Sequence, residues 1–248
     1  MTNIAIVTGG SRGIGRAAAL KLGAAGYTVV VNYTSNAAAA DEVVTSITSK
    51  GGKATAVKGD VSKEADILAL FAAADKLGTL KVLVNNAGVM DQQNRLDEMT
   101  TDRIRRILDI NTFGSIICAR EAVKRMSTKH GGQGGSIVNM SSAAAYHGAP
   151  GLGVEYGASK GAIDVLTIGL GREVAAEGVR VNALRPGIID TEIHDSSGIK
   201  GRVKLMRDAI PMKREGTADE VADAIMWLCS DQSSYVTGSI IPVAGGRC

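Results

Sequence analysis

Short apolar segments alternate with longer helix-like segments from one end of the chain to the other. The apolar segments are rich in β-branched residues and are bounded by Gly, Asn or Asp, a pattern that predicts β-strands. The predicted strands are Asn3–Val7, Thr28–Asn32, Lys53–Lys58, Lys81–Asn85, Ser136–Met140, Val179–Leu184 and Ser239–Val243. The predicted helices are Gly13–Ala25, Asn36–Lys50, Lys63–Leu77, Leu96–Thr128, Tyr156–Glu177 and Ala218–Ser230. The longest, Leu96–Thr128, is expected to break near Asn111.

This alternation predicts an α/β fold, a Rossmann-like, doubly wound, seven-stranded parallel sheet with helices on both faces. With no repeat or linker in the sequence, we expect a single domain over 1–248. Its cofactor half covers roughly 1–110, and its catalytic and substrate half covers roughly 111–248. The irregular segment Gly187–Lys213 is too long for an idle loop and is expected to be a mobile lid over the substrate.

The composition agrees with a packed α/β core. Hydrophobic residues make up 45% of the chain and aromatic residues only 3%, so Ala, Val, Ile and Leu must form the interior. The 31 glycines against 4 prolines favour many tight turns between strands and helices. The net charge of +3 is small, and the absence of a basic run excludes the electrostatic pattern of nucleic-acid binding.

Cysteine usage and the apolar segments indicate the compartment. Cys118, Cys229 and Cys248 are odd in number, far apart and without metal-ligand spacing, which is typical of a reduced intracellular protein. The chain runs from Met1 directly into an apolar strand, and no stretch is apolar and long enough to cross a membrane. We therefore expect a cytoplasmic protein. His130, His147 and His194 lack the neighbours of a metal site, so no metal is expected.

A glycine-rich turn follows the first predicted strand, with the sequence TGGSRGIG from Thr8 to Gly15. Gly9 and Gly13 would let the backbone approach a pyrophosphate, and Gly15 would let the helix pack closely on the strand. The amino end of that helix would offer unpaired N–H groups to the phosphates. A plain glycine-rich turn is the alternative, but its position between the first strand and a helix favours a dinucleotide.

The end of the second strand bears on the choice of cofactor. An NAD enzyme normally has Asp or Glu there to accept hydrogen bonds from the ribose. Here Asn32 takes that place, followed by Tyr33, Thr34 and Ser35, so no carboxylate would repel a 2′-phosphate. Arg12 in the glycine loop offers a cation, unless it only solvates the loop. We predict NADP(H), with NAD(H) the less favoured alternative.

The segment Tyr156-Gly157-Ala158-Ser159-Lys160 has the pattern of a general acid–base site. Residues four apart lie on one face of a helix, so the Tyr156 hydroxyl and the Lys160 ammonium can share one site. A free tyrosine has a pKa of about 10, and a nearby positive charge lowers that pKa toward neutral pH. A tyrosine tuned in this way can give and take a proton.

Further motifs complete a resemblance to the short-chain dehydrogenase/reductase family. They are Gly59-Asp60-Val61, Asn85-Asn86-Ala87-Gly88, Asn111 in DINTFG, Ser141-Ser142 after the fifth strand, and Arg185-Pro186-Gly187 with Thr191 after the sixth. With the glycine spacing and Tyr156-x-x-x-Lys160, the resemblance extends from Thr8 to Gly246.

The resemblance implies roles for individual residues. Ser142 would hydrogen-bond the substrate oxygen, with Ser141 as the competing serine, and Tyr156 would transfer the proton. Lys160 would bind the nicotinamide ribose, and Asn111 would hold a water linking Lys160 to solvent. The implied cofactor-binding residues are Gly9, Ser11, Arg12, Gly13, Ile14, Gly15, Asn32, Tyr33, Thr34, Ser35, Asp60, Val61, Asn86, Ala87, Gly88, Tyr156, Lys160, Pro186, Gly187, Ile189 and Thr191.

The implied substrate is a small-molecule carbonyl or secondary alcohol. One resemblance is to 3-oxoacyl carrier-protein reductases, which carry an arginine near the end of the Tyr-x-x-x-Lys helix. Glu177 lies in that region here, and the segment TKHGGQGG is glycine-rich, which disfavours a carrier protein. Glucose-dehydrogenase-like and general carbonyl-reducing members are the other resemblance. The loops Ala143–Glu155 and Ile188–Met206 would shape the pocket.

Two further expectations concern the protein as a whole. A cofactor-sensing protein without catalysis is an alternative, but such a protein should have lost Ser142, Tyr156 or Lys160. A homotetramer is expected because the strand GSIIPV leaves an apolar sheet edge. The helices Arg103–Thr128 and Tyr156–Glu177 also have small and aliphatic faces suited to pairing.

Overall fold

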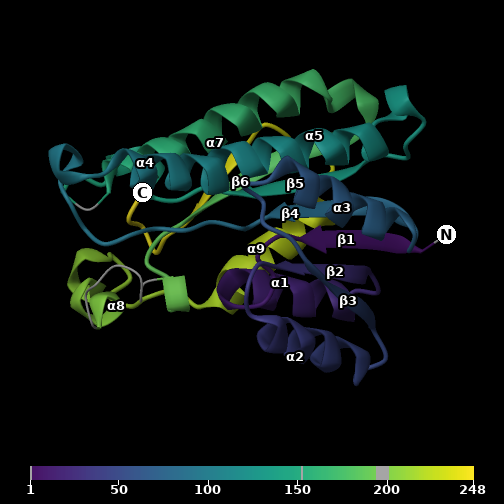
Figure 1. Cartoon of the computed structure of the whole chain (residues 1–248), viewed down its shortest axis with the longest axis horizontal. Helices are drawn as coiled ribbons and strands as arrows, with labels where there is room; N and C mark the ends of the chain where they lie inside the picture. Colours follow the sequence, from purple (N-terminus) through teal and green to yellow (C-terminus); the bar gives the residue numbers. More distant parts are fainter. Residues whose placement is uncertain (1, 152, 194–200) are drawn as a thin grey trace.

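A computed structural model describes residues 2–151, 153–193 and 201–248 (Figure 1). Seven strands form one parallel sheet in the order β3-β2-β1-β4-β5-β6-β7, which confirms the predicted Rossmann-like, doubly wound α/β fold. The strands are β1 (Asn3–Val7), β2 (Thr28–Tyr33), β3 (Lys53–Lys58), β4 (Thr79–Asn85), β5 (Gly135–Met140), β6 (Val179–Pro186) and β7 (Ile240–Val243). The strand order changes direction between β1 and β4, and this is where ligands bind in such sheets.

Alternate side chains of the central strands enter two separate cores, one on each face of the sheet. Ala5 and Val7 of β1 pack with helices α1 (Gly13–Ala24), α2 (Ala37–Thr48) and α9 (Ala218–Cys229). Ile4 and Ile6 of the same strand pack with α3 (Glu64–Asp75) and α5 (Gly114–Met126) on the other face. Burial on both faces explains why these strands read as continuous apolar runs. Figure 1 shows the two helical layers above and below the sheet.

The region predicted as one helix over Leu96–Thr128 contains several shorter elements. A 3₁₀ turn (η1, Leu96–Glu98) precedes α4 (Thr101–Leu108), and α4 joins α5 through a π-helical turn (η2, Asp109–Phe113). The predicted break at Asn111 is therefore confirmed, as a local widening of the helix. An alanine Cβ at Gly114 would lie 2.7 Å from the Val61 carbonyl oxygen. The backbone at the start of α5 therefore packs directly against the turn that follows β3.

The helix that carries Tyr156 differs at both ends from the prediction. Helix α7 spans Val154–Glu173, and a separate 3₁₀ turn (η4) follows at Ala175–Glu177. A four-residue helix, α6 (Ala144–His147), lies in the preceding loop, where no helix was predicted. Tyr156 thus lies in the first turn of α7, and its motif runs into the helix interior.

The segment Gly187–Lys213 contains short elements where it is described. These are α8 (Arg202–Leu205) and a 3₁₀ turn (η6, Arg207–Ala209), and Ile189 forms an isolated bridge with Gly216. His194 and part of the predicted lid lie outside the described residues. Within the part of the chain that the structure covers, no helix combines the length and the apolar character needed to cross a membrane.

Candidate active site

The glycine loop between β1 and α1 has the geometry of an anion cradle. Gly9 (φ +60°) and Gly13 (φ +51°) adopt left-handed conformations that favour glycine. A Cβ at Gly9 would lie 3.1 Å from Ala87 Cα, so the loop passes close to the end of β4. The residue preceding α1, Arg12, makes no side-chain cap, and the first turn of α1 has no acidic residue. The N–H groups at this end can therefore receive a pyrophosphate, and the loop fits a dinucleotide.

Asn86 fastens β4 to the glycine loop. Its Nδ2 donates to the carbonyl oxygens of Thr8 (2.9 Å) and Gly9 (3.0 Å). The backbone N–H groups of Asn86 and Ala87 both donate to Thr8 Oγ1, each at 3.0 Å. A Cβ at Gly15 would lie 2.4 Å from Asn86 Nδ2, so this glycine makes room for the amide. These bonds fix the carboxyl ends of β1 and β4 to each other, at the point where the strand order changes direction.

Asn32 does not lie where the sequence predicted. It is 2% exposed, and its Oδ1 accepts a hydrogen bond from Gly9 N (3.2 Å). Its Nδ2 donates to the carbonyl oxygens of Gly59 (3.0 Å) and Val57 (3.4 Å). Through these bonds the Asn32 side chain joins the glycine loop to the segment after β3. This corrects the expectation that Asn32 faces the adenosine ribose. Tyr33 is the half-buried last residue of β2 and is followed by the exposed Thr34 and Ser35.

Asp60 forms a turn between β3 and α3. Its Oδ1 accepts from the backbone N–H (3.0 Å) and hydroxyl (2.7 Å) of Ser62, and its own N–H donates to Asp66 Oδ2 (2.9 Å). Val61 is buried and lies against Gly114 of α5. These contacts explain the position of both residues, and the contact with an adenine ring remains a prediction.

Helix α7 places Lys160 beside Tyr156 and buries the lysine side chain. Lys160 is 5% exposed, and its Nζ donates to the Met140 carbonyl oxygen at 2.7 Å. This nitrogen lies 5.8 Å from the centre of the Tyr156 ring. Burial lowers the pKa of Lys160 to about 8, because the charged form loses its hydration. The side chain is still mostly an ammonium at neutral pH, and its charge favours the Tyr156 phenolate.

The two serines after β5 make different contacts. Ser141 is buried, and its hydroxyl donates to the Lys160 carbonyl oxygen (3.2 Å), so it holds a turn of α7 against the sheet. Ser142 Oγ accepts from Ala144 N (3.1 Å), which leaves the hydroxyl proton available for a substrate oxygen. These contacts favour Ser142 over Ser141 as the serine that binds substrate.

Asn111 is held in the π-helical turn with no exposed surface. Its Oδ1 accepts from Val89 N (2.8 Å), and its Nδ2 donates to the Val89 carbonyl (2.9 Å) and to Ser159 Oγ (3.1 Å). A Cβ at Gly88 would lie 3.3 Å from Lys160 Nζ and 3.4 Å from Asn111 Oδ1. Asn111 therefore fixes the segment after β4 close to Lys160. Its role toward a water remains a prediction.

One pocket brings together residues that are far apart in the sequence. Of the predicted site residues, those in its wall are Ile14, Asn86, Gly88, Ser142, Tyr156, Lys160, Pro186, Gly187, Ile189 and Thr191. The others lie outside its wall: Gly9, Ser11, Arg12, Gly13, Gly15, Asn32, Tyr33, Thr34, Ser35, Asp60, Val61, Ala87 and Asn111. Thr191 Cγ2 lies 3.3 Å from the position of a Cβ on Gly13, so the segment after β6 reaches the glycine loop.

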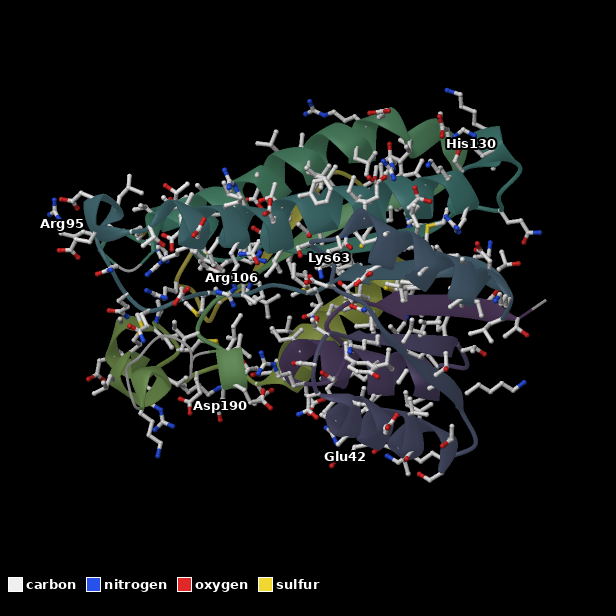
Figure 2. All side chains as sticks on the ribbon, in the orientation of Figure 1. Glu42, Lys63, Arg95, Arg106, His130 and Asp190 are labelled. Carbon is white, nitrogen blue, oxygen red and sulfur yellow. The ribbon has the colours of Figure 1, made fainter. Side chains whose placement is uncertain are left out.

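The pocket wall also contains charged residues that the sequence did not single out. Glu155 pairs with Arg103 of α4. Asp91 pairs with Arg106 of the same helix, and Arg106 is labelled in Figure 2. Arg247 and His147 lie in the wall too, and burial, followed by the charge of Arg247, lowers the pKa of His147. The sequence shows Glu155 directly before Tyr156, but it does not show the pairing with Arg103, which lies 52 residues earlier in the chain.

Metal binding has no support among the described side chains. Over residues 2–151, 153–193 and 201–248, no group of three or more His, Cys, Asp or Glu residues is placed to hold a metal ion.

Comparison with known proteins gives consistent results over the whole length. A family model described as enoyl-(acyl carrier protein) reductase matches residues 9–247. The chain is 56% identical over 245 residues to the uncharacterized oxidoreductase YgfF of Escherichia coli, covering 98% of this chain and 99% of that protein. It is 41% identical over 244 residues to glucose 1-dehydrogenase 2 of Bacillus subtilis, covering 98% and 93%.

Solved structures agree with this result. A 3-ketoacyl-(acyl-carrier-protein) reductase from Brucella melitensis, complexed with NADH, has a TM-score of 0.91 and 33% identity over 99% of this chain and 98% of its own. A variant of a Serratia marcescens short-chain dehydrogenase/reductase has a TM-score of 0.91 and 30% identity, over 99% and 97% of the two chains. The chain belongs to the short-chain dehydrogenase/reductase family, whose oxidoreductases use a nicotinamide cofactor.

Proposed function

We propose that this chain catalyses reversible hydride transfer between NADP(H) and a small carbonyl compound or secondary alcohol. The observation that carries the proposal is the pocket in which Ser142, Tyr156 and the buried Lys160 meet residues of the glycine-loop helix. A protein that only senses the cofactor would have no need to bury a lysine against a tyrosine at this cost in solvation.

A bound nicotinamide would supply or accept the hydride. The Ser142 hydroxyl donates a hydrogen bond to the substrate oxygen and orients it toward Tyr156. In the direction of reduction, the Tyr156 hydroxyl gives its proton to that oxygen and becomes a phenolate. The buried Lys160 ammonium, 5.8 Å from the Tyr156 ring, stabilises this negative charge. Oxidation of the alcohol follows the same steps in reverse.

Tyr156→Phe tests this mechanism because it removes only the hydroxyl. We expect cofactor binding to be retained and turnover to fall by about two orders of magnitude or more, the usual contribution of a general acid–base. Tyr146→Phe is the matched control, since Tyr146 lies on the neighbouring helix α6 and is 69% exposed. Near-normal turnover in Tyr156→Phe with a good substrate would disprove the assignment.

The preference for NADP(H) rests on charge at the end of β2 and at the start of α1. None of Tyr33, Thr34 and Ser35 carries a carboxylate, and Arg12 is exposed immediately before α1. A charge-assisted hydrogen bond from Arg12 to a 2′-phosphate is worth about 1.5–3 kcal/mol, or about one to two orders of magnitude in affinity.

Calorimetric titration of both cofactors measures this contribution. Arg12→Ala should weaken NADPH by about tenfold or more and leave NADH nearly unchanged. Arg16→Ala is the control, because Arg16 is an exposed arginine one turn further along α1. Tyr33→Asp, at the last residue of β2, should favour NADH. Equal affinity of the wild type for both cofactors would contradict the preference.

A second candidate function is reduction of a 3-oxoacyl group on a carrier protein. Because α7 ends at Glu173, its last turn contains the exposed Arg172, and Glu177 lies beyond it in η4, where Ser127 donates to its carboxylate. Lys129 is exposed in the turn that follows Ser127. These cations suit the docking of an acidic carrier protein, and two relatives of 37% and 35% identity are named 3-oxoacyl-[acyl-carrier-protein] reductase.

This candidate predicts faster reduction of an acyl group on the carrier protein than on a short thiol. Reversing both charges, in Lys129→Glu with Arg172→Glu, should remove the advantage without affecting the short thioester. Equal rates for the two thioesters in the wild type would exclude the carrier-protein function.

We further propose a homo-oligomer, with the homotetramer as the specific expectation. On α7, Gly161, Val165 and Gly169 are spaced four apart, and Val165 is 71% exposed. A Cβ at Gly161 or Gly169 would have no atom within 4 Å, so a second helix could approach closely.

A further inference from the structure

The last residues of the chain, after β7, are held firmly against the rest of the molecule. A Cβ at Gly187 would lie 2.8 Å from Ala244 Cα, and a Cβ at Gly246 would lie 3.1 Å from Pro211 Cβ. The backbone N–H of Arg247 donates to the Ala244 carbonyl oxygen at 3.1 Å, which closes a turn. These contacts fix the backbone from which the Arg247 side chain extends.

Arg247 brings a positive charge to the substrate pocket. The residue is half-buried and lies in the same wall as Ser142 and Tyr156. Its guanidinium also acts on His147, another residue of this wall, because burial first and the Arg247 charge second lower the pKa of that imidazole. An arginine keeps its charge at every pH at which proteins are folded. The positive charge therefore belongs to the pocket under all working conditions.

The acidic residues of the same wall are already balanced by other cations. Glu155 pairs with Arg103 at 2.7 Å, and Asp91 pairs with Arg106 at 3.3 Å, so both acids are matched by arginines of α4. In the part of the chain that the structure describes, Arg247 forms no ion pair. Besides the buried lysine next to the catalytic tyrosine, the wall thus offers one positive charge that no described acid balances.

The chemistry of this charge indicates which ligand suits it. A guanidinium is planar, and its donors match the two oxygens of a carboxylate with parallel hydrogen bonds. His147 Nδ1 accepts from Ala149 N (3.2 Å), so the neutral imidazole carries its proton on Nε2 and adds a second donor. One guanidinium balances the single charge of a carboxylate, whereas a phosphate dianion would leave a charge unbalanced.

We propose that Arg247 is a specificity-determining residue that selects carbonyl substrates which also carry a carboxylate. The inference rests on the proposed function, because it assigns the substrate class of the same site. Arg247 binds the carboxylate, while Ser142 and Tyr156 bind the reacting oxygen. The preferred substrates are oxo acids and the corresponding hydroxy acids, in place of uncharged ketones and alcohols.

The test compares two oxo acids, 4-oxopentanoate and 5-oxohexanoate, with their methyl esters. The quantity measured is the ratio of kcat/KM for the acid to kcat/KM for its ester with NADPH, because the two share one reacting carbonyl and differ in charge. We expect a ratio above one in the wild type for at least one chain length. Arg247→Met should lower it by about tenfold or more, since a charge-assisted hydrogen bond is lost. Arg247→Lys keeps the charge without the planar fork and should lower it less.

Arg105→Met is the matched control, because Arg105 is an exposed arginine of α4 outside the pocket wall. It removes the same charge from the molecule as a whole and should leave the ratio unchanged. Titration of NADPH against Arg247→Met should give an unchanged Kd, since the guanidinium is assigned to the substrate and not to the phosphates of the coenzyme. Thermal unfolding of each variant verifies that it is folded.

Three results would overturn the inference while turnover of the esters leaves the proposed function intact. They are a wild-type ratio below one at both chain lengths, a ratio that Arg247→Met does not change or that Arg105→Met lowers equally, and an equal loss of NADPH affinity in Arg247→Met. Absence of turnover of acids and esters alike in the wild type overturns the proposed function and this inference with it.

Discussion

At the scale of single residues, Lys160 shows a conflict between stability and function. Its pKa of about 8 lies below the ordinary value of 10.5, so between these values the unfolded chain holds a proton that the folded chain has lost. Stability therefore rises with pH across that window, and the full cost of burying the ammonium is present below pH 8. At about 1.4 kcal/mol per pKa unit, this cost is on the order of 3 kcal/mol.

Lys160→Met should therefore stabilise the protein while it abolishes most of the turnover. The lost hydrogen bond to the Met140 carbonyl removes about 1 kcal/mol of the gain, which leaves a rise in Tm of several degrees at pH 7. Calorimetry of the cofactor-free protein checks the sign. The difference in Tm should shrink from pH 8 toward pH 10.5, and a variant less stable than the wild type at pH 7 would contradict the explanation.

Asn32 provides a second prediction at this scale. Asn32→Asp removes both Nδ2 donors and places a carboxylate against the Gly59 and Val57 carbonyl oxygens. We expect a loss of about 1–3 kcal/mol of stability and weaker binding of NADPH and NADH alike, with no switch between them. Denaturant midpoints and titrations measure both effects. Asn36→Asp is the control, because Asn36 caps α2 at an exposed position where aspartate caps equally well.

These residues also show what a sequence can predict about the site. Tyr156 and Lys160 share a helix face, so their proximity follows from local geometry alone. The pairing of Glu155 with Arg103 depends on how α4 packs on α7, which the sequence does not contain. Asn32 was misplaced because strand residues alternate between faces. Tyr33 packs with Val31 in one core, whereas Asn32 points the other way with Val30.

At the scale of elements, α7 lies very close to the turn before β7. A Cβ at Gly171 would meet the backbone nitrogen of Gly238 at 2.7 Å and its Cα at 2.8 Å. Gly171→Ala should therefore push the helix from the sheet and cost about 1–3 kcal/mol, measured by chemical unfolding. Gly59→Ala is the control, because a Cβ there meets nothing nearer than 3.4 Å. Equal stability of the two variants would refute this explanation.

The central strands were predictable because burial on both faces gives them nearly uninterrupted apolar sequences, as in β1. The edge strand β3 has no buried residue and was predictable from its short length and its flanking glycines. The ends of the elements were less predictable. Helix α7 ends at Glu173 and Val174 is its buried C-cap residue, although the following Ala175–Glu177 has the composition of a helix and forms a separate 3₁₀ turn. Helix α6 has four residues, too few to show a helical period.

At the scale of the whole molecule, an exposed apolar surface marks the proposed contact between subunits. Val165 on α7 is 71% exposed, and Phe113 and Ile116 beside the start of α5 are 38% and 40% exposed. Val165→Lys should lower the oligomeric state in sedimentation at micromolar concentration, since a charge cannot be buried there without a partner. Leu68→Lys on α3, at 43% exposure, is the control. A wild type that sediments only as a monomer would exclude the oligomer.

The contact between Thr191 and the glycine loop constrains the sequence of events in turnover. The pocket that contains Ser142 and Tyr156 is bounded by Ile14, Gly88 and Thr191, which are assigned to the cofactor. If these assignments hold, we expect the coenzyme to lie along this wall of the pocket, with the substrate bound against it beside Ser142 and Tyr156. We would then expect the coenzyme to bind first and leave last, with the alcohol departing before the oxidised coenzyme. The kinetics would follow a compulsory order, with product inhibition competitive only between the two forms of the coenzyme.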